Sequence, residues 1–125
     1  MNCVKTGRKY EEKAAVFLKE QGFSVIEKNY RGRQGEIDII GIHENCLVFV
    51  EVKYRRDDKS GIPEEAVGAG KQGKICRTSD YFRLCHRQYD SLQIRYDVVA
   101  ITGEEIRWYQ NAFPYQKGNF QKNGW

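Results

Sequence analysis

The sequence predicts an α/β domain in which a mixed central β-sheet is flanked by helices, in the order αβββαββ. Two observations predict this fold class. Helix-type apolar spacing alternates with short strand-type runs along 125 residues, a length that suits one domain with its own core. The run 46–54 is apolar on both faces, which is typical of a central strand covered by helices on each side. We expect the domain to span residues 1–113.

The first half of the chain predicts one helix and three strands. Apolar residues at helical spacing indicate a helix over 7–21, and Gly22 ends it. A short strand is expected over 23–26. Two longer strands over 36–42 and 46–54 are separated by only a few polar residues, which predicts a β-hairpin.

The second half predicts a helical region and two closing strands. Pro63, followed by two glutamates, is a favourable helix start. Three glycines then interrupt the pattern, so a second start near Lys71 is expected, with helix to about His86. Strands over 93–101 and 106–109 complete the sheet.

Composition indicates an ordinary globular protein. Apolar residues make up 40% and charged residues 30%. No run approaches the roughly eighteen apolar residues of a membrane span, and the first residues do not resemble a signal peptide, so we expect a cytoplasmic protein without membrane contact. The four cysteines lack the paired spacing of zinc sites, which favours reduced thiols over zinc. The polar residues 114–125 are expected to form a disordered tail.

Charge is distributed unevenly along the chain. Residues 1–35 carry a net charge of +4, residues 36–52 carry −4 with no Lys or Arg, and residues 53–95 carry +4 again. An acidic segment between basic flanks suits a cation site inside a surface that attracts phosphates. Charge runs are also common on ordinary solvated surfaces, so the pattern alone does not decide.

The predicted hairpin brings two acids together. A turn centred between Glu44 and Asn45 places Asp38 opposite Glu51, about 5 Å apart. Two such carboxylates repel each other unless a cation lies between them, and oxygen ligands of this kind suit Mg²⁺ or Mn²⁺. Lys53 shares the face of Glu51 and can orient an attacking water or neutralise a developing oxyanion. The alternative is that Lys53 forms a simple salt bridge with one of the acids.

Other charged residues are predicted to face the core and therefore to need partners. Glu11 lies on the apolar face of the first helix, where a metal or a local ion pair would satisfy it. Lys71 precedes Ile75 on the core-facing stripe of the second helix, so a site carboxylate or a bound phosphate is expected beside it. Arg95 and Asp97 are interpreted as a structural salt bridge.

Arginines flank the acidic hairpin on both sides. Arg31 and Arg33 precede it, and Arg55 and Arg56 follow it. They are candidates for contacts with backbone phosphates. The alternative is that they are solubilising loop charges.

Five segments resemble the bacterial YraN-like family. They follow one another in order between about residues 7 and 113: Gly-Glu-Ile-Asp-Ile-Ile at 35–40, Val-Phe-Val-Glu-Val-Lys-Tyr-Arg at 48–55, Lys-Gln-Gly-Lys at 71–74, Arg-Tyr-Asp-Val-Val at 95–99 and Asn-Ala-Phe at 111–113.

That family is similar to the restriction-endonuclease-like PD-(D/E)xK superfamily, especially to archaeal Holliday-junction resolvases. The resemblance implies a mixed sheet flanked by helices, a Mg²⁺ or Mn²⁺ cofactor, nucleic acid as partner and pairing as a homodimer. The proline of the superfamily motif is absent, since Ile37 precedes Asp38. The roles implied are metal ligands at Asp38 and Glu51, the catalytic lysine at Lys53, an auxiliary acid at Glu11, and nucleic-acid contacts from the helix motif at Lys71, Gln72 and Lys74.

The leading hypothesis from the sequence is a metal-dependent endonuclease that hydrolyses DNA, with branched or single-stranded DNA as candidate substrates. DNA is preferred to RNA only through the resemblance. Two alternatives stay open: a non-catalytic nucleic-acid-binding module whose acids form ion pairs, and a scaffold that recruits another protein.

Overall fold

A computed structural model describes the chain over residues 3–55 and 67–117. Five strands form one sheet in the order β1-β2-β3-β4-β5. Only β3 and β4 are parallel, and the other neighbours are antiparallel. The predicted mixed sheet flanked by helices is therefore confirmed. The elements are α1 (Cys3–Glu20), β1 (Ser24–Arg31), β2 (Glu36–His43), β3 (Cys46–Arg55), α3 (Ala69–Cys85), the short 3-10 helix η1 (Arg87–Tyr89), β4 (Gln93–Thr102) and β5 (Glu105–Tyr109).

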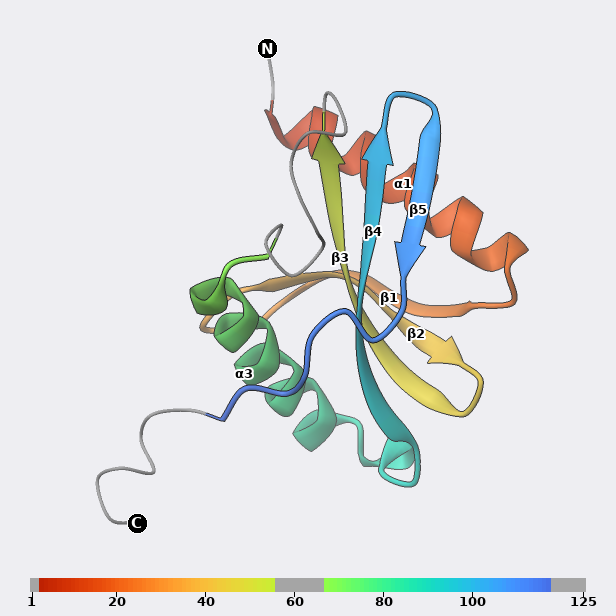
Figure 1. Ribbon diagram of the computed structural model, residues 1–125. Coiled ribbons are helices and arrows are strands. Elements are labelled where there is room, and N and C mark those ends of the chain that lie inside the picture. Colours follow the sequence, from red (N-terminus) through yellow and green to blue (C-terminus); the bar gives the residue numbers. More distant parts are fainter. Residues whose placement is uncertain (1–2, 56–66, 118–125) are drawn as a thin grey trace.

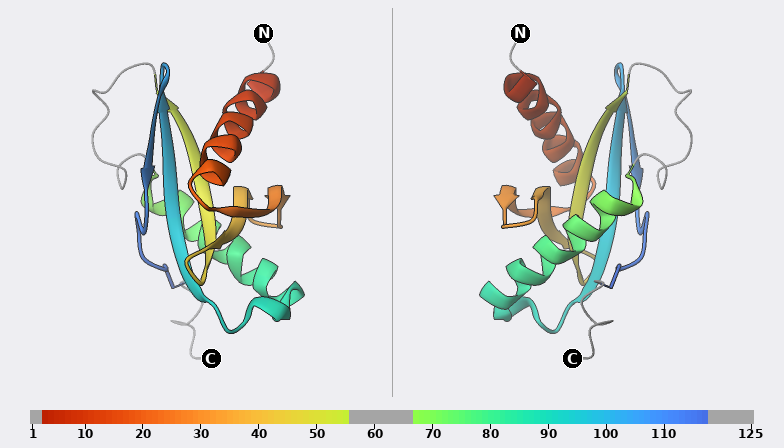
Figure 2. Two further views of the ribbon diagram at one scale, coloured as in Figure 1. Left: turned by 90° about the vertical axis from the view of Figure 1, so that its right-hand side faces the viewer. Right: turned by 90° about the vertical axis from the view of Figure 1, so that its left-hand side faces the viewer.

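The two long helices cover opposite faces of the sheet. In Figure 1, α1 lies behind the strongly twisted sheet and α3 lies in front of it, and Figure 2 shows the same layers from the sides. Leu18 of α1 packs with Val48 and Val50, whereas Phe82 of α3 packs with Phe49 in a second cluster. Strand β3 is thus apolar on both faces because it is buried between the two helices.

The hairpin of β2 and β3 has the predicted register. Ile40 pairs with Phe49, and the pairing runs from Ile39 to His43 on β2. The two turn residues have positive φ angles, 51° at Glu44 and 65° at Asn45. Such a turn matches the twist of the flanking strands, and asparagine tolerates this conformation.

The end of α1 fixes where the first strand begins. Gly22 has φ +93°, and Phe23 N–H donates to the Leu18 carbonyl over 3.0 Å. This is the Schellman arrangement, in which glycine ends the helix and an apolar residue folds back onto it. Strand β1 continues to Arg31, beyond the predicted 23–26, because its polar residues lie on an exposed edge strand where alternation is weak.

The region around α3 matches the prediction in part. Helix α3 begins at Ala69, close to the second start expected near Lys71, whereas the start expected at Pro63 lies outside the described residues. The tail expected from residue 114 is described only to residue 117. There the Tyr115 hydroxyl donates to Asp80 over 2.7 Å.

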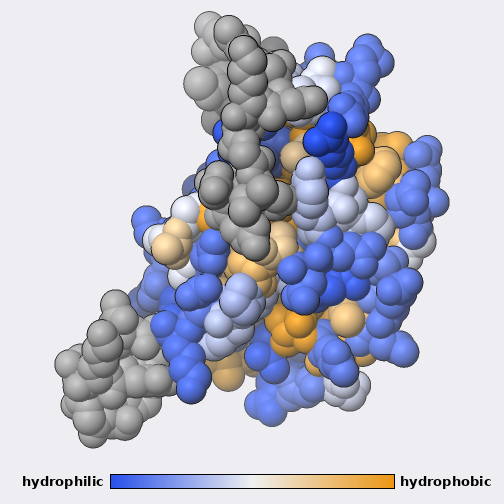
Figure 3. Space-filling model, in the orientation of Figure 1, coloured by the Kyte–Doolittle hydropathy of each residue, from blue (hydrophilic) through white to orange (hydrophobic). Residues whose placement is uncertain are grey.

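Three further features of the described chain concern its surface, its cysteines and the polarity of its helices. The face in Figure 3 is largely hydrophilic, with smaller apolar areas between polar side chains. Cys46, Cys76 and Cys85 are free thiols. None of the helices in the described ranges is both long and apolar enough to cross a membrane.

Candidate metal centre and active site

Three carboxylates from two elements meet beside the hairpin. Glu11 comes from α1, and Glu36 and Asp38 come from β2. Each offers one oxygen, and these oxygens lie within 4.8 Å of one another. We call these three residues the acidic cluster. Glu36 and Asp38 are two residues apart on one strand, so their side chains start from the same face of the sheet.

Asp38 lies just beyond the last paired residues of the hairpin. Its Oδ2 accepts a hydrogen bond from the Val52 backbone N–H over 2.8 Å. Burial raises the pKa of Asp38 to about 7, and the charge of Glu11 adds to this rise, although the Val52 hydrogen bond opposes it. The carboxylate is therefore poised between its charged and neutral forms at neutral pH.

Glu11 has a buried oxygen that nothing in the described chain satisfies. Its Oε1 is inaccessible to solvent and has no hydrogen-bond partner among the described residues. Burial raises the pKa of Glu11, while Asp38 and Asn29 lower it. The prediction that Glu11 turns toward the sheet is confirmed by this placement, and its Oε1 could accept a bond from a ligand or ion.

Glu51 has a different partner from the one that the hairpin pairing suggests. Its Oε2 lies 2.6 Å from Nζ of Lys71 on α3, and Glu51 is only 4% exposed. Burial and the charge of Asp38 raise the pKa of Glu51 to about 7. Although burial opposes it, Glu51 raises the pKa of Lys71 above its ordinary value. The sequence predicted either a site carboxylate or a bound phosphate beside Lys71, and the structure has a carboxylate there.

Asp38 and Glu51 are therefore near each other, but they do not form the pair of opposed carboxylates that the hairpin register predicted. The hairpin pairing reaches Ile39 and Val50, one pair short of Asp38 and Glu51. Glu51 is not one of the three acids within 4.8 Å, and its place in that group is taken by Glu36. Sequence reasoning missed Glu36, although its spacing of two residues from Asp38 on a strand could have indicated it.

Lys53 lies two residues beyond Glu51 on β3 and is half-buried. Its charge lowers the pKa of Glu51, so the two side chains are near each other. Among the residues that the structure describes, Lys53 forms no ion pair. The alternative in which Lys53 is held by Asp38 or Glu51 as a salt bridge is therefore not what the structure shows.

The four arginines expected to contact phosphates differ in how far the structure describes them as exposed. Arg31 and Arg33 are exposed, Arg55 is half-buried, and Arg56 lies outside the described residues. The Arg31 guanidinium is 3.8 Å from the Glu36 carboxylate, with 80% of its side chain exposed. Most of Arg31 is thus accessible to a ligand.

The helix motif divides into exposed lysines and a buried glutamine. Lys71 and Lys74 are exposed, whereas Gln72 is only 8% exposed. Its amide nitrogen donates to the Val67 carbonyl over 2.7 Å, and its Oε1 accepts from Gln116 over 3.1 Å. The surface contact predicted for Gln72 is not what this placement provides, because the side chain is engaged inside the fold.

A second buried charge group lies farther along the sheet. Arg95 donates to Asp97 over 3.0 and 2.8 Å, which confirms the predicted salt bridge. Asp97 is fully buried and also accepts from the Trp108 indole and the Asn111 backbone, each over 2.9 Å. Both carboxylate oxygens are satisfied, as a structural ion pair requires.

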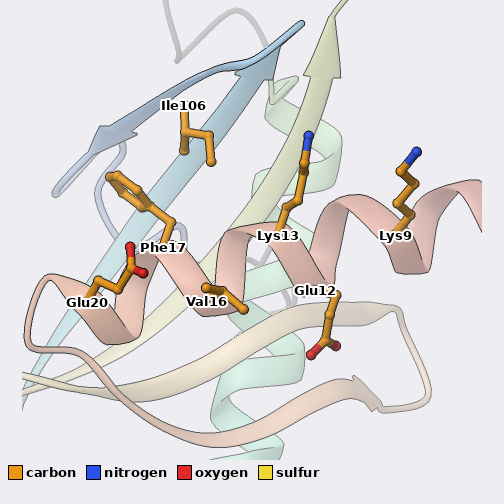
Figure 4. Close-up of a pocket in the computed structure, with 7 residues that line it drawn as sticks. All are labelled: Lys9, Glu12, Lys13, Val16, Phe17, Glu20 and Ile106. Atoms are coloured by element: carbon orange, nitrogen blue, oxygen red, sulfur yellow. The ribbon is translucent and has the colours of Figure 1, made fainter.

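The described surface also has an open groove between α1 and β5. Its volume is about 580 Å³. The residues that line it, labelled in Figure 4, are Lys9, Glu12, Lys13, Val16, Phe17, Glu20 and Ile106. Glu12 at its edge pairs with Lys28 over 2.8 Å. The groove lacks the convergent polar groups of a catalytic site, so the acidic cluster is the better candidate.

Comparison with known proteins supplies the family. The family described as "Uncharacterised protein family UPF0102" matches residues 10–101 of this chain. The chain belongs to this family. Membership of the YraN-like family, predicted from the sequence motifs, is thereby confirmed.

Relatives within the UPF0102 family are similar over nearly their whole length. The UPF0102 protein of Lachnoclostridium phytofermentans is 46% identical over 90% of this chain and 96% of its own length. The UPF0102 protein of Cytophaga hutchinsonii is 47% identical over 85% of this chain and 92% of its own. The UPF0102 protein FN1370 of Fusobacterium nucleatum is 35% identical over 89% and 92%. These names state a family and no activity.

Proposed function

We propose that this UPF0102 protein is a metal-dependent endonuclease that hydrolyses phosphodiester bonds of DNA with Mg²⁺ or Mn²⁺. The observation that carries the proposal is the acidic cluster, in which a buried oxygen of Glu11 has no hydrogen-bond partner among the described residues. A cluster of carboxylates that only balanced surface charge would have no reason to bury an oxygen without a donor.

The donor set fits a hard divalent ion. All three acids of the cluster offer oxygen, which Mg²⁺ and Mn²⁺ prefer over nitrogen or sulfur. Glu11, Glu36 and Asp38 would hold the ion, with Glu51 as a further acid beside them. The raised pKa of Asp38 also fits, because a cation stabilises the charged form that burial disfavours.

The remaining groups suit phosphoryl chemistry. A bound divalent ion supplies positive charge beside the scissile phosphate and lowers the pKa of a water that it holds. Lys53, with no ion pair among the described residues, is available to orient that water or to neutralise charge on a phosphate oxygen. Lys71 favours the charged form of Glu51, although burial still raises the pKa of Glu51 to about 7, and the exposed side of Lys71 can contact the phosphate backbone together with Arg31.

The resemblance to PD-(D/E)xK nucleases and archaeal Holliday-junction resolvases supports the same chemistry. It assigns metal binding to Asp38, Glu51 and Glu11 and catalysis to Lys53. The choice of DNA over RNA rests on this resemblance. A non-catalytic binding module is the second candidate, and the ion pair between Glu51 and Lys71 favours it, because that pair satisfies Glu51 without a metal.

The experiment is cleavage of a substrate panel with Mn²⁺ or Mg²⁺. Duplex, single-stranded, flap and four-way-junction DNA are incubated with wild type, Asp38→Asn, Lys53→Met and Glu11→Gln. We expect loss of roughly 10²-fold or more for Asp38→Asn and Lys53→Met, since each removes charge stabilisation of the transition state.

Glu12→Gln is the matched control for Glu11→Gln, because Glu12 is the next residue on α1 and already pairs with Lys28 at the surface. It should keep wild-type activity. Equal cleavage by all variants would identify a contaminating enzyme and end the proposal. Metal-independent binding with no cleavage of any substrate would favour the binding module.

A further inference from the structure

Lys71 brings a positive charge of the protein itself to one acid of the candidate site. Its Nζ lies 2.6 Å from Oε2 of Glu51, whose side chain is buried. A buried carboxylate needs a cation or a proton, and this one has an ammonium at the distance of a short, charge-assisted hydrogen bond. Glu51 therefore has a counter-charge before any metal ion binds.

The same ammonium lies near the acidic cluster. The charges of Asp38 and Glu36 raise the pKa of Lys71, and the charge of Lys71 in turn lowers the pKa of Asp38. Interactions between charges weaken with distance, so Nζ is within electrostatic reach of two of the three acids. Lys71 comes from α3 and Glu11 from α1, the helices that Figure 2 shows on opposite faces of the sheet. The cation and the acidic cluster thus meet from two sides of the sheet.

The acidic cluster differs from Glu51 in how it is balanced. Among the ion pairs of the described residues the cluster takes part in one, between Glu36 and Arg31. The two charged groups are 3.8 Å apart and 80% of the Arg31 side chain is exposed, so water screens the pair. The three carboxylates therefore still favour an external cation, whereas Glu51 already has one from the protein.

The balance of charge limits how many divalent ions the site can hold. Glu51 and Lys71 cancel each other, which leaves the three carboxylates of the acidic cluster. One divalent ion balances two of them, and Lys53, whose charge also reaches Glu51, balances the third. A second divalent ion would lie close to two ammonium groups and to the first ion, and all three would repel it.

We propose that the ammonium of Lys71 takes the place of a second metal ion, so that the acidic cluster binds a single divalent ion and Glu51 is not one of its ligands. This inference rests on the proposed function for the presence of an ion, and it specifies the number of ions and their ligands. It departs from the resemblance, which includes Glu51 among the metal ligands and assigns Lys71 to nucleic-acid contacts.

The test counts the Mn²⁺ ions bound per chain in the absence of nucleic acid. Electron paramagnetic resonance measures the free Mn²⁺ that remains during a titration at pH 8. Wild type should bind one ion. Lys71→Ala removes the ammonium and leaves its space empty beside Glu51, so this variant should bind a second ion. Lys71→Arg keeps a cation at this position and should bind one ion, like wild type.

Two further variants identify where the second ion binds. Lys71→Ala combined with Glu51→Gln should return to one ion, because the acid that holds the second ion is then gone. Lys74→Ala is the matched control, since Lys74 lies three residues farther along α3 and is exposed, and it should bind one ion. Thermal unfolding verifies that each variant is folded.

Two results would overturn the inference: two ions in wild type, of which Glu51→Gln loses one, or no additional ion in Lys71→Ala. The proposed function can fail separately. If wild type bound no ion while Lys71→Ala bound one through Glu51, the proposed function would end and the role of Lys71 would stand. If wild type bound two ions and cleaved DNA, the proposed function would stand and this inference would end.

Discussion

Two groups of charged residues, one around Asp97 and one at the acidic cluster, differ in whether every buried oxygen has a donor. Around Asp97 every carboxylate oxygen has a donor, from Arg95, Trp108 and the backbone of Asn111. In the acidic cluster, Glu11 buries an oxygen that has no partner within residues 3–55 and 67–117. The first group is complete within the protein alone. The second leaves that oxygen without a donor among the described residues, and the divalent ion of the proposed function would satisfy it.

The largest expected difference between the two groups is in stability. Asp97→Asn leaves Arg95 buried without its counter-charge and should lower the free energy of unfolding by about 3–5 kcal/mol. Asp38→Asn removes repulsion from Glu11 and should leave stability at pH 7 unchanged or raise it slightly. Urea denaturation of both variants measures this. Comparable losses in the two variants would mean that Asp38 is a structural residue.

The carboxylates of the proposed site should also make the free energy of unfolding depend on pH. The pKa values of Asp38 and Glu51 rise from 3.8 and 4.5 to about 7 in the folded protein. Between these values the folded state binds more protons than the unfolded state, so the free energy of unfolding falls as pH rises from about 4 to 7. The fall should be on the order of a few kcal/mol without divalent ions.

Asp38→Asn isolates the contribution of one group, because the same measurement on wild type includes every other titrating side chain. As pH rises from 4 to 7, the free energy of unfolding of Asp38→Asn should increase relative to that of wild type. A constant difference would show that Asp38 has an ordinary pKa.

Divalent ions should stabilise the protein through the acidic cluster. At pH 7.5, Mg²⁺ or Mn²⁺ at ten to thirty times its Kd should raise the free energy of unfolding by about 1–2 kcal/mol. Glu11→Gln should reduce this gain and Glu12→Gln should not, as thermal denaturation with and without the ion can measure. A gain that is equal in both variants would place the ion elsewhere.

The smallest effect is expected at the ion pair between α3 and β3. Lys71→Met should cost about 1 kcal/mol at pH 8, because Lys71 is half exposed and water screens the pair. At pH 5 the cost should vanish, since Glu51 is then protonated in the fold. Lys74→Met, on the exposed side of the same helix, should cost nothing at either pH. A loss for Lys71→Met that is equal at both pH values would reflect packing and not charge.

Sequence patterns predicted the fold where they were periodic. The hairpin register followed from its two turn residues, and the inward face of α1 followed from helical spacing, which also placed Glu11. The length of β1 could not be predicted, because an exposed edge strand lacks alternation.

The residues of the candidate site were easier to predict than the contacts between them. Glu36 was not predicted because the hairpin register relates residues on two opposite strands, whereas Glu36 and Asp38 lie two residues apart on one strand. A site carboxylate or a phosphate was predicted beside Lys71, but that this carboxylate is Glu51 depends on how α3 crosses the sheet, which local patterns do not encode. The engagement of Gln72 with Gln116 likewise requires two segments far apart in sequence.

The order of these residues along the chain bears on how the protein is synthesised. The acids of the proposed site lie between residues 11 and 51, while the ammonium that balances Glu51 comes from residue 71. A nascent chain that has emerged only to the end of β3 therefore carries its full set of carboxylates without that cation. Glu51 in such a chain lacks the ion pair that the complete fold gives it, so we expect burial of Glu51 among the first three strands to be less favourable until α3 emerges.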